Sequence, residues 1–289
     1  MQISLAQVDS GDDTSRNLDL IRGAVARAAG DGSTLVFLPE YSMYEKKVVD
    51  GTFSGVAEPV DGSFATAISN LAVEHRIAIV VGMVESNEAS TKPYNTLIAI
   101  GDDGRLLARY RKIHLFDSYG FKESEWIAPA PEPEPVTFEV GGARIGLMTC
   151  YDLRFPELGR ELADAGAQLV GVCSSWVPGD HKADQWRVLA RARAIENSYF
   201  VAAVSQAAPI SIGRSLLCSP SGVVLGELGD APGTLTASFD PDEVAAARER
   251  DPVLLNRRMG AGGTGGAQTG DARMGGQTVE TPIAAQHSR

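Results

Sequence analysis

Short runs of almost purely apolar residues recur along the chain, and they limit the folds that it can adopt. Residues 77–84 and 169–172 contain no charged or hydrogen-bonding side chain. A strand with one face in water alternates apolar and polar residues, so strands of this composition must be covered on both faces. Because amphipathic helical segments lie between the runs, the pattern predicts an α/β fold in which helices pack against the sheets.

The order of these segments defines the expected elements. We expect strands at residues 3–7, 34–38, 77–84, 96–100, 106–110, 144–148, 169–172, 200–205, 214–219, 222–226 and 234–239. Helical periodicity predicts helices at 64–75, 156–165, 183–196 and 242–248, and a first helix that Ser15 caps and Gly30 ends. No internal repeat or linker interrupts the alternation, so we expect one domain over residues 1–255.

Residues 256–289 have a different composition, in which glycine, threonine, glutamine and alanine dominate. Such a segment buries too little apolar surface to offset the entropy that it would lose on ordering. We therefore expect these residues to form a Gly-rich disordered tail.

The charge of the chain and the segments that it lacks exclude several classes of protein. The formal net charge is −11, whereas nucleic acid and anionic membranes both attract a basic face, so neither is an expected partner. No run approaches the roughly 18 apolar residues of a membrane helix. The N-terminus lacks the basic and apolar regions of a signal peptide, so we predict a cytoplasmic protein.

The three cysteines are Cys150, Cys173 and Cys218, and only the first has a distinctive position. Their number and spacing fit neither a disulfide framework nor a structural zinc site, so no metal is predicted. Cys173 and Cys218 lie inside apolar strands, where a thiol is expected to be a buried small hydrophobe. Cys150 ends a strand and precedes Pro156, which is suited to open a helix. A thiol on this turn lies at the sheet edge where α/β folds place ligands, and a structural role is an equal alternative.

Two further reactive groups follow strands in the same way. Glu40 comes after the apolar run 34–38, and Lys112 comes after the strand 106–110. A thiol needs a base or a cation to become a nucleophile, and a carboxylate and an ammonium at the same sheet edge supply both. His114 offers a Cys–His dyad as an alternative, without distinctive local support in the sequence.

These residues lie in segments that resemble the three signature blocks of the nitrilase superfamily of carbon–nitrogen hydrolases. The blocks are Phe37-Leu-Pro-Glu40-Tyr, Tyr110-Arg-Lys112-Ile-His-Leu-Phe-Asp117 and Met148-Thr-Cys150-Tyr-Asp-Leu-Arg-Phe-Pro-Glu157. Further segments match in the expected order: Tyr94-Asn95-Thr96, Gly120-Phe-Lys-Glu123-Ser124 and Arg191-Ala-Arg-Ala-Ile-Glu-Asn197. The resemblance extends over residues 1–250, which is nearly all of the predicted domain.

The resemblance implies a four-layer αββα sandwich of the nitrilase type with a catalytic triad of Glu40, Lys112 and Cys150. Glu40 is then the general base for the thiol and later serves the leaving amine and the hydrolytic water. Lys112 favours the thiolate and helps to hold the developing oxyanion. The backbone N–H of Tyr151 is the second oxyanion donor, by analogy with the residue after the nucleophile in other hydrolases.

The resemblance also assigns further parts of the chain. Glu123 matches the family's second glutamate, which orients Lys112 and the substrate, and Glu125 is the competing residue. The helix at 183–196 is similar to the family segment that packs at a two-fold interface, which implies a homodimer or a larger homo-oligomer. No metal or organic cofactor is implied.

The reaction implied by the resemblance is attack on a C–N carbon followed by hydrolysis of a Cys thioester. The block Cys150-Tyr-Asp-Leu-Arg-Phe is similar to the branch of ω-amidase and deaminated-glutathione amidase, whereas true nitrilases typically have Cys-Trp-Glu. This favours an enzyme that hydrolyses a small linear amide to ammonia and a carboxylic acid. Alternatives are an N-carbamoyl-compound hydrolase or a nitrilase of the same superfamily and, in a different class, a non-catalytic binding scaffold, which the complete triad disfavours.

The same branch indicates an amide that carries a carboxylate, and such a substrate needs a cation in the pocket. Arg154 and Lys182 are the candidates, and arginine is better equipped because it pairs with carboxylates in bidentate geometry. The alternative for Arg154 is a structural ion pair with Asp152 or Glu157. Trp176 follows another strand end, where it either lines the pocket or packs beneath the loop.

Overall fold

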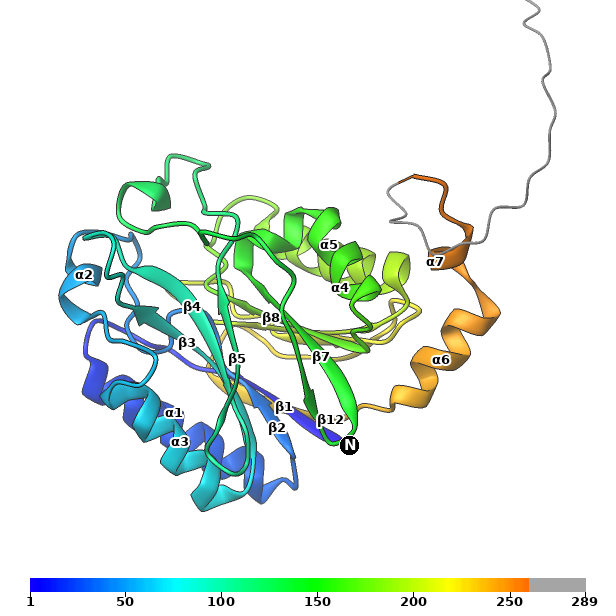
Figure 1. Ribbon diagram of the computed structural model, residues 1–289, viewed down its shortest axis with the longest axis horizontal. Coiled ribbons are helices and arrows are strands. Elements are labelled where there is room, and N and C mark those ends of the chain that lie inside the picture. The colour runs from blue at the N-terminus through cyan, green and yellow to red at the C-terminus, as the bar shows by residue number, and fades with distance from the viewer. Residues whose placement is uncertain (260–289) are drawn as a thin grey trace, which may run out of the picture. The chain divides into compact units, whose positions relative to one another are not determined.

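The computed structural model describes residues 1–259, which form two mixed six-stranded sheets with helices on their outer faces (Figure 1). The strand order is β12-β1-β2-β3-β4-β5 in the first sheet and β11-β10-β9-β8-β7-β6 in the second. Helices α1 and α3 cover the first sheet, and α4 and α5 cover the second (Figure 1). The layers therefore follow the order helix, sheet, sheet, helix, which confirms the predicted αββα sandwich.

The predicted strands and helices are all present, with ends that differ from the predicted ones. The strands are β1 (Gln2–Gln7), β2 (Leu35–Phe37), β3 (Ala78–Glu85), β4 (Tyr94–Ile100), β5 (Leu106–Arg111), β6 (Thr137–Val140), β7 (Ala143–Thr149), β8 (Leu169–Ser174), β9 (Phe200–Ser205), β10 (Leu216–Cys218), β11 (Val224–Glu227) and β12 (Gly233–Ser238). The helices are α1 (Thr14–Gly30), α2 (Thr52–Val56), α3 (Ser63–His75), α4 (Pro156–Asp164), α5 (Lys182–Asn197), α6 (Pro241–Arg250) and α7 (Val253–Asn256). The sequence did not predict β6, α2 or α7.

The cap of α1 corrects one prediction. Ser15 does not cap this helix, because α1 begins at Thr14 and the side chain of Asp13 accepts hydrogen bonds from the backbone N–H groups of Ser15 and Arg16. Aspartate and serine are both favourable at this position. The choice between neighbouring candidates therefore depends on where the chain enters the helix, which composition does not reveal.

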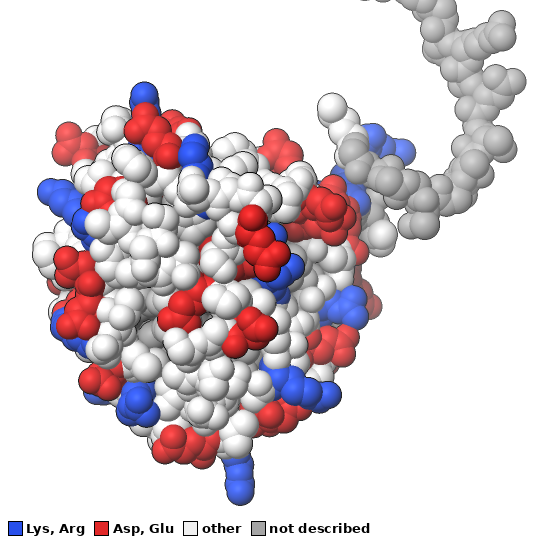
Figure 2. Space-filling view, turned by 60° about the vertical axis from the view of Figure 1, so that its left-hand side comes forward, with Lys and Arg blue, Asp and Glu red and all other residues white. Residues whose placement is uncertain are grey.

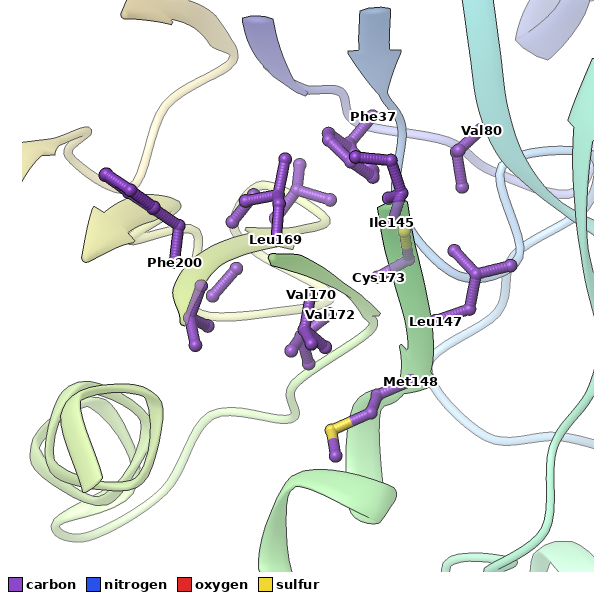
Figure 3. Close-up of a cluster of buried hydrophobic side chains, with 14 of the residues drawn as sticks. Phe37, Val80, Ile145, Leu147, Met148, Leu169, Val170, Val172, Cys173 and Phe200 are labelled. Atoms are coloured by element: carbon purple, nitrogen blue, oxygen red, sulfur yellow. The ribbon is translucent and has the colours of Figure 1, made fainter. Parts of the chain in front are cut away.

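The strands are apolar because both faces of each sheet are covered, one by the facing sheet and the other by helices. In β2, Leu35 and Phe37 belong to the core between the sheets, whereas Val36 packs in the core under α1 and α3. Figure 3 shows Phe37 in this inter-sheet core with Ile145 of β7. A Cβ at Gly171 of β8 would overlap the ring of Phe37, so a glycine is required for the close approach of the two sheets.

The chain divides into two units, Met1–Leu255 and Asn256–Arg289, and the first contains both sheets. Most of the predicted disordered tail lies outside the described residues, so its disorder stays a prediction. No helix within residues 1–259 is long and apolar enough to cross a membrane. Figure 2 shows acidic and basic side chains interspersed over one face.

Candidate active site

The side chains of Glu40, Lys112 and Cys150 lie in one pocket at the ends of three strands. Glu40 lies in the loop after β2, Lys112 directly follows β5, and Cys150 directly follows β7. Strand β3 is parallel to β2, and two successive antiparallel pairings give β5 the same direction. The carboxyl ends of β2 and β5 therefore share one edge of the first sheet, and β7 supplies the thiol from the facing sheet.

The loop that carries Glu40 is held against β3 at Gly82. The N–H of Gly82 donates to the carbonyl of Pro39 over 3.2 Å, and the N–H of Met43 donates to the carbonyl of Gly82 over 3.1 Å. A Cβ at position 82 would lie 2.5 Å from the backbone nitrogen of Tyr41 and 2.7 Å from the carbonyl oxygen of Pro39. These distances are too short for any side chain, so glycine lets the loop approach the strand and fixes the position of Glu40.

Lys112 joins two carboxylates in the pocket. Its Nζ lies 2.7 Å from Oε1 of Glu40 and 2.8 Å from Oε2 of Glu123, and its side chain is only 2% exposed. Nδ2 of Asn95 donates to both carboxylates, over 2.6 Å to Glu40 and 3.0 Å to Glu123. Burial alone would lower the pKa of Lys112, but the charges of Glu123 and Glu40 raise it well above its ordinary value. Lys112 is therefore an ammonium.

Glu123, and not Glu125, enters the pocket. The carboxylate of Glu123 also accepts hydrogen bonds from the hydroxyl of Tyr41 over 2.8 Å and from the N–H of Phe116 over 2.7 Å. Burial would raise the pKa of Glu123, but the charge of Lys112 and these hydrogen bonds bring it below its ordinary value. Glu125 is exposed and forms its ion pair at the surface. The structure therefore shows which of the two glutamates enters the pocket, a choice that the sequence left open.

Cys150 occupies a sharp turn between β7 and α4. Its φ is +47°, in the left-handed region that residues other than glycine rarely adopt. The buried carboxylate of Asp152 holds the turn, because it accepts hydrogen bonds from the N–H of Thr149 over 2.9 Å and from the hydroxyl of Tyr110 over 2.6 Å. Helix α4 begins at Pro156. The predicted strand-to-helix turn is therefore present in the structure.

His114 contacts this turn but not the thiol. Its Nδ1 lies 2.8 Å from Oδ1 of Asp152, and its ring stacks on Phe155 with 3.6 Å between the ring centroids. Within residues 1–259, His114 forms no hydrogen bond with Cys150. The geometry therefore gives no support to a Cys–His dyad, and the imidazole instead braces the turn through Asp152.

The thiol of Cys150 is buried beside Glu40. Burial and the negative charge of Glu40 raise the pKa of Cys150 well above its ordinary value, and the charge of Lys112 opposes this only in part. Sγ lies 3.8 Å from the carbonyl oxygen of Ser175, whose N–H donates to Oε2 of Glu40 over 2.7 Å. A resting thiol next to a carboxylate is an arrangement in which the carboxylate can remove the proton as sulfur attacks.

The pocket around Cys150 extends in two directions, which we call the first arm and the second arm. The residues that line the first arm include Glu40, Glu45, Lys112, Phe121 and Glu123. The second arm is lined by Tyr151, Arg154, Trp176 and Lys182. Both arms share Phe116, Cys150, Ser175 and Val177. The four residues predicted to bind substrate thus lie together, next to the thiol.

Arg154 forms neither of the ion pairs that the sequence left open. Its Nη2 donates to Oε1 of Gln185 over 2.7 Å, and its guanidinium carbon lies 5.0 Å from the centre of the Trp176 ring. Among the described residues, Arg154 has no ion pair with Asp152 or Glu157. The positive charge therefore faces the second arm without an acidic partner.

Lys182 is a second cation in this arm. Its Nζ lies 3.8 Å from the centre of the Tyr119 ring, and no carboxylate in the described part of the chain pairs with it. Burial and the charge of Arg154 lower the pKa of Lys182. Trp176 donates to the carbonyl of Lys182 over 3.0 Å and its ring lies 5.2 Å from that of Trp186, so Trp176 both lines the arm and packs beneath the loop. Two neighbouring cations without carboxylates favour an anionic ligand.

Four residues that line or support the site were given no role in it from the sequence: Asn95, Asp152, Ser175 and Glu45. Asn95 had a signal, because it lies in the matching segment Tyr94-Asn95-Thr96, the polar first part of a strand that is apolar from Leu97 on. Asp152 had another, since it stands three residues after Thr149 in the spacing of a capping box, and its carboxylate accepts the N–H of Thr149. Ser175 and Glu45 lie in loops whose composition gives no comparable signal.

The cation at the centre of the site is the ammonium of Lys112. Its two carboxylate contacts, with Glu40 and Glu123, take up the negative charge that would otherwise attract a metal ion. Within residues 1–259, no group of three or more histidine, cysteine, aspartate or glutamate side chains is arranged to hold a metal.

The chain is similar to known proteins over the whole part that contains the pocket. Residues 2–249 match the family described as carbon–nitrogen hydrolase. The hydrolase Rv0480c of Mycobacterium tuberculosis is 43% identical over 273 residues, which cover 89% of this chain and 95% of that protein. Deaminated glutathione amidase of Escherichia coli O157:H7 is 32% identical, with 84% and 92% covered. Human omega-amidase NIT2 is 33% identical, with 89% and 93% covered.

A solved structure with the same fold is a glutamate-to-glutamine mutant of the amidase from Nesterenkonia sp. AN1. It superposes with a TM-score of 0.77 at 29% identity, over 89% of this chain and 94% of that one. In that protein the active-site cysteine carries the acetamide moiety of fluoroacetamide.

Proposed function

Because this chain belongs to the carbon–nitrogen hydrolase family, we propose that it is an amidase that hydrolyses small linear amides bearing a carboxylate group. The observation that carries the substrate class is the pair of cations, Arg154 and Lys182, in the arm beside the thiol of Cys150. The names of two relatives, deaminated glutathione amidase and omega-amidase, support an amide as the reacting group.

In the proposed complex the substrate spans the thiol and the second arm. Its carboxylate pairs with Arg154 and Lys182, and the amide carbon lies next to Sγ of Cys150. Its nitrogen then faces Glu40, which lines the first arm and not the second. Holding the substrate at both ends restricts it to the orientation in which sulfur can reach the carbonyl carbon.

In the first half of the reaction, Glu40 removes the thiol proton as Sγ forms a bond to the amide carbon. Lys112 and the N–H of Tyr151 stabilise the negative charge that develops on the carbonyl oxygen. The C–N bond then breaks, Glu40 gives its proton to the departing nitrogen, and ammonia leaves. The acyl group is now a thioester of Cys150.

In the second half, water takes the place of ammonia beside Glu40. Glu40 removes a proton from this water as its oxygen attacks the thioester carbon. The C–S bond breaks, and the proton passes through Glu40 to Sγ, which restores the thiol. The hydrogen bonds of Asn95 and of the Ser175 N–H hold Glu40 in one position for both steps.

Ammonia release from a panel of compounds tests this function. The panel contains ω-monoamides of dicarboxylic acids, aliphatic amides of the same length, an N-carbamoyl amino acid and a nitrile. We expect release from the monoamides to be the fastest, and we expect it to be absent in Cys150→Ala. Release only from the carbamoyl compound or the nitrile would contradict the amidase assignment, and release from none would favour a binding scaffold.

Replacement of Arg154 with leucine tests the recognition of the carboxylate. We expect KM for the monoamide to rise roughly tenfold or more, because a charge-assisted hydrogen bond is lost. The matched control is Arg105→Leu, in the exposed turn between β4 and β5, which should leave KM unchanged. An equal loss on the uncharged aliphatic amide in Arg154→Leu would show that Arg154 acts on the structure of the site and not on the carboxylate.

The experiments above test neither the oligomeric state nor the location of the protein. Assembly into a homodimer or a larger homo-oligomer stays a prediction from the sequence resemblance, and a cytoplasmic location stays a prediction from the N-terminal sequence.

A further inference from the structure

The proposed reaction leaves most of the first arm without an occupant. The acyl group extends from Cys150 into the second arm, and the leaving nitrogen faces Glu40 in the first. Ammonia is a single heavy atom, whereas the lining of the first arm includes Glu45, Val49 and Phe121 in addition to Glu40. The space past the leaving nitrogen is therefore larger than a primary amide needs.

Glu45 is a buried carboxyl group in this arm that the proposed reaction does not use. It is 2% exposed, and its Oε1 accepts a hydrogen bond from the N–H of Lys46 over 2.9 Å. Its Oε2 is buried and has no partner within hydrogen-bonding distance among the described residues. A buried polar atom without a partner is costly, so its presence on a pocket wall indicates a partner supplied by a ligand.

The surroundings of Glu45 define the chemistry of that partner. Burial raises the pKa of Glu45 well above its ordinary value, and the charge of Glu40 adds to it. The Ser175 hydroxyl opposes this only in part, because it pairs with the hydroxyl of Ser211 and lies outside hydrogen-bonding distance of Glu45. Burial thus favours the protonated form of Glu45, and a protonated carboxyl group can both donate and accept a hydrogen bond.

Of the three lysines that line this arm besides Lys112, Lys46 pairs with Asp50 and Lys122 with Glu125. Lys47 has no ion pair among the described residues, and its charge disfavours a cationic ligand. A neutral hydroxyl matches this environment.

We propose that the first arm binds the leaving amine, and that Glu45 is a specificity-determining residue that forms a hydrogen bond with a hydroxyl group on that amine. This inference rests on the proposed function. It extends the substrates from primary amides to amides of small hydroxyl-bearing amines.

The extended reaction needs no chemical group beyond those already named. Sγ of Cys150 bonds to the amide carbon, the C–N bond breaks, and Glu40 passes the thiol proton to the nitrogen, so that a neutral amine leaves. Water then supplies the oxygen of the new C–O bond as the C–S bond breaks, and its proton returns to Sγ through Glu40. An amide and water give a carboxylic acid and an amine.

Three amides of one dicarboxylic acid test the inference. They are the primary monoamide, the N-(2-hydroxyethyl) monoamide and the N-propyl monoamide, of which the last two are closely matched in size. We expect the wild-type enzyme to hydrolyse both substituted amides, with kcat/KM roughly three- to tenfold higher for the hydroxyethyl compound. In Glu45→Leu this ratio should fall to about one, whereas Glu45→Gln, which still donates and accepts, should keep a ratio clearly above one.

Glu125→Leu is the matched control, because Glu125 is an exposed glutamate that does not line the pocket, and the ratio should stay at the wild-type value. Hydrolysis of the primary amide alone would overturn the leaving-group subsite and leave the proposed function intact. Hydrolysis of none of the three would reject the proposed function itself. Equal kcat/KM values for the hydroxyethyl and propyl compounds in the wild-type enzyme would show that Glu45 does not recognise the hydroxyl group, and no variant would be needed for this conclusion.

Discussion

Replacement of Glu40 with glutamine is expected to abolish most of the turnover and yet to make Cys150 ionise at a lower pH. The amide of glutamine cannot accept the thiol proton or return it to the leaving nitrogen, so kcat for the monoamide should fall by about a thousandfold or more. The same change removes a negative charge from beside the thiol. Because the charge of Glu40 raises the pKa of Cys150 and the charge of Lys112 lowers it, the pKa of Cys150 should decrease in this variant.

Two measurements separate these opposite effects. Turnover is followed by ammonia release, and thiolate formation by the pH dependence of alkylation with iodoacetamide, located by mass spectrometry. Cys173 and Cys218 are buried in strands and should react slowly in every variant. Glu125→Gln removes an exposed glutamate and should alter neither quantity. An alkylation profile that stays in place or moves to higher pH would contradict the electrostatic role that we assign to Glu40.

The layers of the fold could be predicted from the sequence because burial leaves a direct trace in composition. Strands β3 and β8 are apolar on both faces, and both are covered by a helix layer and by the facing sheet. Strand β6 left no such trace, because within residues 1–259 it is an edge strand whose one partner is β7, and it has exposed and partly exposed residues. The pairing of β12 with β1 is also beyond sequence reasoning, since it joins segments more than two hundred residues apart.

The sequence could predict those residues of the candidate site that follow the end of a strand. Glu40, Lys112 and Cys150 were candidates because a reactive side chain that follows a strand is placed at a sheet edge, and the resemblance to the signature blocks then assigned them as a triad. Glu123 and Glu125 could not be distinguished, because which of two residues in one 3₁₀ turn points inward depends on how that turn packs. Glu45 lies in a charged loop, and its burial follows from contacts that only the folded chain creates.

Replacement of Lys112 with methionine is expected to destabilise the folded protein in a pH-dependent manner. Lys112 is the ammonium that pairs with the buried carboxylates of Glu40 and Glu123. Removing one partner of a buried ion pair leaves an uncompensated charge, which typically costs about 3–5 kcal/mol. We therefore expect the free energy of unfolding near pH 7 to decrease by about this amount, together with loss of turnover, and urea denaturation measures the first quantity.

The pH dependence of this loss of stability follows from the pKa of Glu123, which differs between the wild-type protein and the variant. In the wild-type protein the pKa of Glu123 is lowered, so its contribution to stability is present above the pKa of the unfolded chain and is lost as the pH falls. Without Lys112, burial raises the pKa of Glu123, so folding then favours the protonated form and loses stability as the pH rises. The difference between the two proteins should therefore shrink on acidification and grow toward neutral pH.

Lys122→Met is the matched control, because Lys122 is exposed and pairs with Glu125 at the surface. An exposed ion pair contributes little to stability, so this variant should stay within about 0.5 kcal/mol of the wild-type protein at every pH. A destabilisation by Lys112→Met that is the same at pH 5 and pH 7.5 would mean that lost packing of the lysine side chain outweighs the unpaired carboxylates. A destabilisation that disappears on acidification would identify charge compensation by Lys112 as the reason why two carboxylates can lie buried beside the thiol.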